Sequence, residues 1–102
     1  MKTIYKFEIP AEDEFSLKMS AGARVLSAQT HGEGALATAQ CWVLVDTDRP
    51  LVDHLFAVRG TGHNAEGLES ATYIGAFQFG NGALVFHLFD RGEFLVRPEQ
   101  SV

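Results

Sequence analysis

The sequence feature that most constrains the fold is a two-residue alternation of apolar and polar side chains within short segments. In residues 3–9 the odd-numbered side chains are mostly apolar, and in residues 15–19 the same pattern repeats with Phe15, Leu17 and Met19. Such a period places the apolar side chains on one face of a β-strand. Pro10 ends the first segment, because proline cannot donate a hydrogen bond to a neighbouring strand.

The same pattern predicts further strands over residues 24–29, 40–45, 53–59, 71–79 and 83–89, with a final edge strand over residues 93–97. Turns are expected at residues 21–23, 46–50, 80–82 and 90–92, a turn or hairpin tip within residues 31–39, and at most one helical turn within residues 65–70. The Asn-Gly pair in the 80–82 turn is typical of a tight hairpin, because its residues accept positive φ. We therefore predict one all-β domain over residues 1–102, an antiparallel β-sandwich or small barrel of seven to eight short strands.

Composition limits the class of protein. The chain has 102 residues, enough for one domain, and carries 8 Lys and Arg against 13 Asp and Glu, for a net charge of −5. This balance argues against direct binding of nucleic acid, which requires a basic surface. The single cysteine, Cys41, excludes an intrachain disulfide and fits a reducing cytoplasm. No apolar run is long enough to predict a membrane span or a signal peptide.

The loop Gly60-Thr61-Gly62-His63 is the first candidate site for a small ligand, with Arg59 beside it. Two glycines allow the backbone to approach a ligand closely and to present N–H groups to an anion. Thr61 adds a hydroxyl, and His63 adds a donor that is charged near neutral pH. The alternative is a turn that ends a strand. The loop is not a phosphate-binding P-loop, because the lysine and the following serine or threonine are missing.

A second set of residues is predicted to form a protein interface. If the sheet has an open face, Trp42 forms an aromatic patch with Tyr73 and Phe77; if its strand is central, Trp42 packs in the core. His87 alternates with Phe86 and Leu88, which places it on the face opposite to theirs. The acidic run Glu12, Asp13 and Glu14 is either a solvated turn or part of the same interface.

No motif predicts catalysis or a metal centre. None of the four histidines is spaced from another or from Cys41 as zinc ligands usually are. The acidic turn at residues 46–53 lacks the glycine and the terminal glutamate of a calcium-binding loop. No Gly-x-Ser-x-Gly elbow is present. We therefore expect no enzyme activity, no cofactor and no metal.

Several blocks of the chain resemble a family of small phage- and prophage-encoded proteins of unknown function. They are residues 2–7, 21–27, 41–46, 60–63, 73–77 and 84–89, so the resemblance covers about residues 1–90. The chain departs from the family pattern at Asn64, where proline is common, within residues 31–39, and after Asp90. The resemblance implies a mobile-element origin, a setting in which small proteins often bind and inhibit a host component.

Three functions remain open at this level. The first is a cytoplasmic protein that binds and blocks a host defence assembly, in the manner of an anti-CRISPR protein. The second is a binder of a small ligand, such as a nucleotide signal, through residues 60–63. The third is a minor virion or assembly protein. A monomer or a homodimer is expected, and sequence alone does not choose between them.

Overall fold

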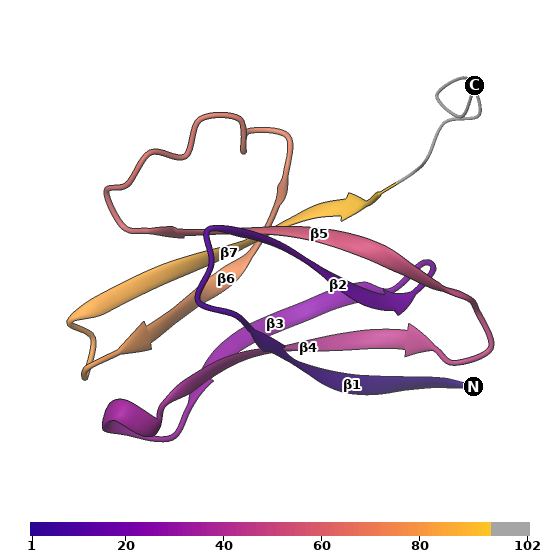
Figure 1. The fold of residues 1–102 in the computed structure, drawn as a ribbon, viewed down its shortest axis with the longest axis horizontal. Coiled ribbons are helices and arrows are strands. Elements are labelled where there is room, and N and C mark those ends of the chain that lie inside the picture. The colour runs from indigo at the N-terminus through magenta and orange to yellow at the C-terminus, as the bar shows by residue number, and fades with distance from the viewer. Residues whose placement is uncertain (95–102) are drawn as a thin grey trace.

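The computed structural model describes residues 1–94, which form seven β-strands and one short 3-10 turn (Figure 1). The prediction of an all-β domain is confirmed. No helix within these residues has the length and apolarity needed to cross a membrane. The strands are β1 (Lys2–Ile9), β2 (Glu14–Ser20), β3 (Arg24–His31), β4 (Thr38–Asp46), β5 (Leu51–Gly60), β6 (Thr72–Phe79) and β7 (Leu84–Glu93), and the 3-10 turn is η1 (Gly34–Leu36).

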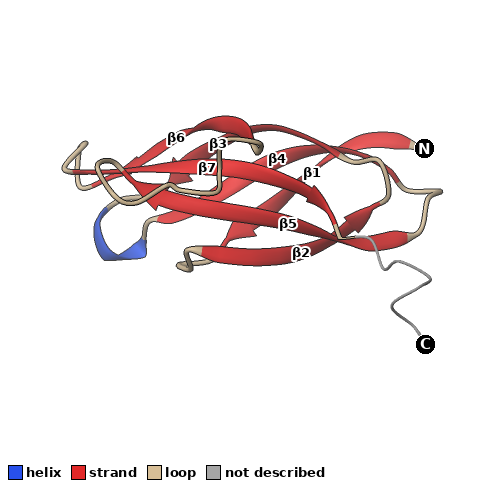
Figure 2. Cartoon of the chain, turned by 90° about the horizontal axis from the view of Figure 1, so that it is seen from above, coloured by secondary structure: helices blue, strands red, loops and turns tan. Residues whose placement is uncertain are grey.

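The strands pair into two antiparallel sheets that pack face to face, so the fold is a sandwich rather than a barrel (Figure 2). Sheet A has the order β1-β4-β3, and sheet B has the order β2-β5-β7-β6. The first two strands therefore pair with distant ones: Thr3 lies opposite Val45, and Phe15 lies opposite Phe56.

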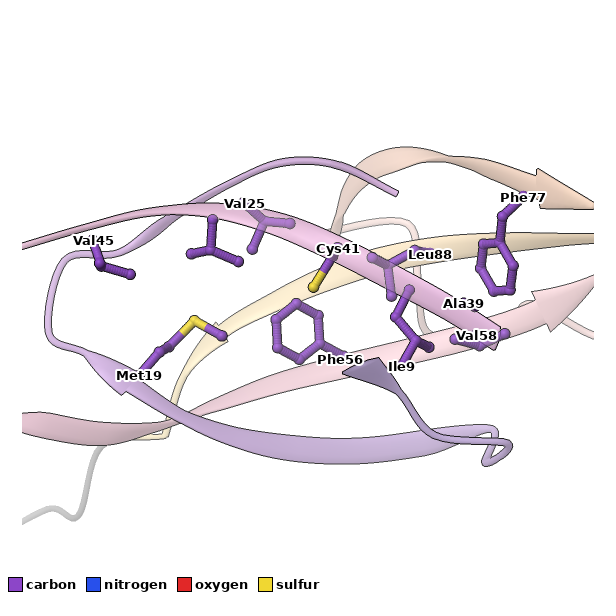
Figure 3. Packing of buried hydrophobic residues seen from close by; sticks show 11 residues of the cluster. Ile9, Met19, Val25, Ala39, Cys41, Val45, Phe56, Val58, Phe77 and Leu88 are labelled. Carbon is purple, nitrogen blue, oxygen red and sulfur yellow. The ribbon is translucent and has the colours of Figure 1, made fainter. Parts of the chain in front are cut away.

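The core is a continuous row of apolar side chains between the two sheets (Figure 3). It runs from Met19 and Val45 at one end, past Cys41 and Phe56, to Phe77 at the other. The alternation in the sequence produces this row directly, because every second side chain of β4 points into the sandwich. Burial of these apolar side chains is the main force that holds the two sheets together.

The sheets are also joined along one side. Thr30 on β3 donates its hydroxyl to the carbonyl oxygen of Gln78 on β6 and accepts a hydrogen bond from the Gln78 N–H.

At the start of β1, the N-terminal amino group lies 2.7 Å from a carboxylate oxygen of Asp48. The connection from β1 to β2, residues 10–13, crosses between the layers and leads the chain from sheet A to sheet B.

Two turn predictions have different outcomes. The hairpin at residues 80–82 is confirmed: Asn81 and Gly82 have φ values of 56° and 92°, and the Ala83 N–H donates to the Gly80 carbonyl. The turn predicted at residues 90–92 is wrong. These residues form a bulge inside β7, in which Arg91 is the extra residue between Asp90, opposite Phe56, and Gly92, opposite Leu55. The strand predicted over residues 93–97 extends beyond the described residues, and its first residue belongs to β7.

Candidate functional site

The outer face of sheet B carries the candidate site, because the long connection from β5 to β6 folds over it. This connection is the wide loop that joins β5 to β6 in Figure 1. Leu68, near its middle, is 5% exposed, and Ala57 on the outward side of β5 is fully buried. The burial of both residues indicates that the loop covers this part of the sheet. Its first residue, Thr61, is held beside β7 by a hydrogen bond to the Val85 carbonyl.

Residues 60–63 form a tight turn. The His63 N–H donates to the Gly60 carbonyl over 3.0 Å, and Gly62, the third residue, has a φ of 85°. This combination is that of a type II β-turn, which requires glycine at the third position. Gly60 leaves room for the His63 ring, because an added Cβ would lie 2.8 Å from it and the ring would have to move. The close approach that glycine permits here is made by the chain's own histidine.

His87 is held between two hydroxyl groups. Its Nδ1 lies 2.9 Å from the Tyr73 hydroxyl, and its Nε2 lies 2.8 Å from the Thr61 hydroxyl. Thr61 is fixed in turn by its backbone N–H, which donates to the Val85 carbonyl. This chain of hydrogen bonds orients the imidazole ring and joins β6 and β7 to the loop after β5. The prediction that His87 faces away from Phe86 and Leu88 agrees with this placement.

These side chains surround a shallow depression that we call the aromatic hollow. Its volume is about 380 Å³, and it is lined by Arg59, Gly60, Thr61, Gly62, His63, Ala65, Tyr73, His87 and Phe89. Tyr73 is 52% exposed and packs edge-on against the ring of Phe89. Residues predicted for two separate purposes, a ligand loop and a protein interface, therefore lie in one place.

A second depression, the acidic hollow, adjoins the first and shares Arg59 and His63 with it. Its volume is about 490 Å³, and it is lined by Asp13, Glu14, Arg59, His63, Asn64 and Glu66. Three of these six residues carry carboxylates, and all three are exposed. Glu14 makes an ion pair with Arg91, so Asp13 and Glu66 are the carboxylates of this hollow without an ion pair to another described residue.

Arg59 lies between the two hollows, and three of its hydrogen bonds run to backbone carbonyl oxygens. Its Nε donates to the Asn64 carbonyl, and its Nη1 donates to the carbonyl oxygens of Asp13 and Val58. Its Nη2 lies 3.9 Å from a Glu14 oxygen. The guanidinium group therefore holds the loop before β2 and the loop after β5 against sheet B through hydrogen bonds. These hydrogen bonds fix the walls of both hollows.

Three residues predicted for the interface lie elsewhere. Phe77 is 5% exposed and belongs to the core, which removes it from the predicted surface patch. Trp42 is half-buried on the outer face of sheet A, opposite Lys6 and Ser27. It therefore cannot form a patch with Tyr73 on sheet B. Glu12 is exposed but lines neither hollow.

Comparison with known proteins identifies the family. A model described as domain of unknown function DUF7352 matches residues 1–97. The chain belongs to the DUF7352 family. No curated protein and no solved structure matches it.

One polar feature of this DUF7352 domain was not foreseen from its sequence. His54 and Asp90 form a buried pair between the sheets, with His54 Nε2 2.6 Å from Asp90 Oδ1 and side chains 4% and 17% exposed. The Gly92 N–H donates to the same oxygen, so the bulge in β7 holds the carboxylate in place. Burial alone would raise the pKa of Asp90, but these two hydrogen bonds outweigh it and keep the pKa below its ordinary value. The signal was present in the sequence, because His54 is spaced by two residues from Phe56 and by four from Val58 and so lies on the same face of the strand as they do.

The DUF7352 domain shows no metal centre within residues 1–94: no three of their His, Cys, Asp and Glu side chains are grouped so as to hold an ion. Cys41 is buried, and burial raises the pKa of its thiol to about 11. A thiol in this state is a poor nucleophile at neutral pH. The groups that face solvent at the two hollows can donate, accept and stack, which is the chemistry of recognition.

Proposed function

We propose that this protein acts by binding a partner protein, which docks across the aromatic and acidic hollows. The observation that carries the proposal is that the two hollows share Arg59 and His63 and so form one surface. One half offers aromatic rings and the other offers carboxylates. A partner that fits both presents an apolar or aromatic side chain beside a basic one.

The chemistry of the surface favours a protein over a nucleotide or another anion. Two of the turn's backbone N–H groups, those of Thr61 and His63, already donate within the chain. The Nε and Nη1 groups of Arg59 serve carbonyl oxygens, and its Nη2 faces the Glu14 carboxylate at 3.9 Å. The neighbouring carboxylates would repel a phosphate, and an anion that used the bonded donors would have to displace internal hydrogen bonds.

The aromatic hollow has the character of an interface anchor. Tyrosine buries a large area on binding at a small cost in side-chain entropy, and tyrosine is frequent among the residues that dominate binding energy. The Tyr73 ring is already oriented by His87 and Phe89, so little freedom remains to be lost. The acidic hollow supplies charge complementarity, which steers association and selects a basic partner.

The narrower form of this proposal is that the partner belongs to a host defence assembly such as a CRISPR effector. Its support is the resemblance to phage- and prophage-encoded proteins, together with a compact binding surface. Effectors of this kind bind nucleic acid through basic grooves, which are suitable partners for an acidic surface.

The test is a pair of matched double variants. Glu66→Lys with Tyr73→Ala changes both hollows, and Glu33→Lys with Tyr5→Ala makes the same changes on the loop after β3 and on β1. Tyr5 is 48% exposed, close to the 52% of Tyr73. The unmodified protein is purified from its host, its native mass identifies the bound polypeptide, and the affinity of each variant for that polypeptide is measured by calorimetry.

We expect the E66K/Y73A variant to lose at least about 30-fold in affinity, as for an interface residue worth about 2 kcal/mol. The E33K/Y5A variant should bind within about threefold of the unmodified protein. Equal binding by both variants would place the interface elsewhere. A native mass raised by only a few hundred daltons would support the small-ligand alternative instead.

A further inference from the structure

The end of the sandwich at which β1, β5 and β6 finish contains a cavity between the two sheets. Its volume is about 400 Å³, within the range of small-molecule sites. It lies on the inner side of the sandwich, whereas the aromatic hollow lies on the outer face of sheet B. The cavity is lined by Glu8, Ile9, Pro10, Ala11, Glu12, Asp13, Ala37, Thr38, Ala39, Val58, Phe77, Phe79 and Phe86.

The inner wall of the cavity is aromatic. Phe77, Phe79 and Phe86 contact one another, with ring centroids 5.8 to 6.1 Å apart. Ile9 and Val58 add further apolar side chains to the lining. A cluster of three phenylalanines that lines a cavity prefers an apolar occupant over water, and the faces of such rings attract a cation.

The size of the cavity follows from small side chains. Residues 11, 37 and 39 are all alanine, and they line the cavity from the loop after β1 and from the start of β4. Leucine or phenylalanine at these positions would fill the space, as the larger residues do elsewhere between the sheets. Pro10 ends β1 and turns the chain across the cavity, so the loop 10–13 forms one side of its opening.

The rim of the cavity is acidic. Glu12 and Asp13 on the loop after β1 are exposed and lie on it, and among the described residues its lining contains no lysine, arginine or histidine. Neither carboxylate forms an ion pair with another residue among those described. Apolar walls with carboxylates only at the mouth complement one kind of molecule, which has an apolar body and a positive charge at one end.

We propose that this cavity binds a small organic amine with an aromatic or branched apolar body. The body lies against Phe77, Phe79 and Phe86, and the ammonium group remains at the mouth beside Glu12 and Asp13. The charge stays near water, so its desolvation cost is low, and the apolar part supplies most of the affinity. The proposal concerns residues other than those of the protein-binding surface and is independent of it, apart from Asp13, which both share.

The probes are three molecules of nearly equal shape: 2-phenylethylamine, 2-phenylethanol and 3-phenylpropionate. They are cationic, neutral and anionic at pH 7, and their binding is measured by calorimetry or ligand-observed NMR. We expect the amine to bind at least tenfold more tightly than the alcohol, and the carboxylate to show no binding. Equal binding of amine and alcohol, or no binding of the amine, would overturn the proposal.

Variants locate the site. Ala37→Trp should fill the cavity and abolish binding of the amine, and Ala11→Trp on the exposed loop does the same if the first variant fails to fold. Glu12→Gln with Asp13→Asn should weaken the amine about tenfold and leave the alcohol unchanged. Glu66→Gln, which removes a carboxylate outside the cavity, is the control and should change neither. Amine binding that survives the tryptophan in a folded variant would show that the ligand sits elsewhere.

Discussion

The buried pair of His54 and Asp90 offers the sharpest test of the fold, through the substitution Asp90→Ala. The change removes the hydrogen-bond partner of His54 Nε2. The other ring nitrogen, Nδ1, is buried and already has no hydrogen-bond partner among the described residues. The variant would therefore leave an imidazole ring between the sheets with both nitrogens unpaired.

The expected cost is about 3 kcal/mol, the lower end of the range for breaking a buried pair by removing one partner. The lower end applies because Asp90 is 17% exposed, so water can reach part of the site. In a domain of about 100 residues this corresponds to a fall of roughly 12–24 °C in Tm. Asp90→Asn is the matched control, because its amide oxygen still accepts from His54 and from the Gly92 N–H. It should cost no more than about 1.5 kcal/mol.

The pair also predicts a dependence on pH. The pKa of Asp90 is lower in the folded protein than in the unfolded chain, because His54 and Gly92 donate to the ionised form. The stability that this group contributes is therefore complete above the unfolded pKa, about pH 4, and is lost as the pH falls through the folded pKa. The advantage of the unmodified protein over D90N should shrink below about pH 4.

Urea unfolding followed by the fluorescence of Trp42, the only tryptophan, measures all three proteins. If D90A lies within about 1 kcal/mol of the unmodified protein, the pair does not stabilise the fold as described. If D90A and D90N are equally destabilised, the charge of Asp90 matters and its hydrogen bonds do not. Either result would refute the argument.

Further predictions concern Cys41, Gly60, Gly62 and Phe77. Cys41, whose thiol has a pKa of about 11, should react with a disulfide reagent at pH 8 only as fast as the protein unfolds, since roughly one thiol in a thousand is ionised. Gly62→Ala should lower the free energy of unfolding in urea by about 1–2 kcal/mol because of its φ of 85°. Gly60→Ala should displace the His63 ring, and the stability it loses should be restored by His63→Ala. Phe77→Ala should cost about 3–5 kcal/mol by the same assay; a cost below 1 kcal/mol would contradict its place in the core.

The strands were predictable because their information is local. Alternating side chains and Pro10 define β1, and Asn81 and Gly82 adopt the positive φ values that their sequence favours. The bulge at Asp90 was not predictable in the same way. An Asp-x-Gly sequence suits a turn or a bulge equally well, and only pairing with β5 decides between them.

The individual residues of the candidate site could be predicted from the sequence, but their assembly into one surface could not. Residues 60–63, Tyr73 and His87 each carried a local signal, yet their proximity depends on the order β5-β7-β6 in sheet B. This order inserts the last strand between its two predecessors and brings His87 next to Thr61. The same non-local information separates Trp42 from Tyr73, because it assigns β4 and β6 to different sheets.

The strand order has a consequence for how the chain is made on the ribosome. β1 can pair only with β4, so sheet A can form only after Asp46, the last residue of β4, has emerged. At that moment Cys41, Val43 and Val45 form an exposed apolar surface, because β5 and β7 of the opposing sheet B are still to be translated. Folding that depends on such distant partners is slow and vulnerable to aggregation. A fragment ending near residue 50 should therefore be insoluble, and the yield of the whole chain should improve when synthesis is slowed by cold.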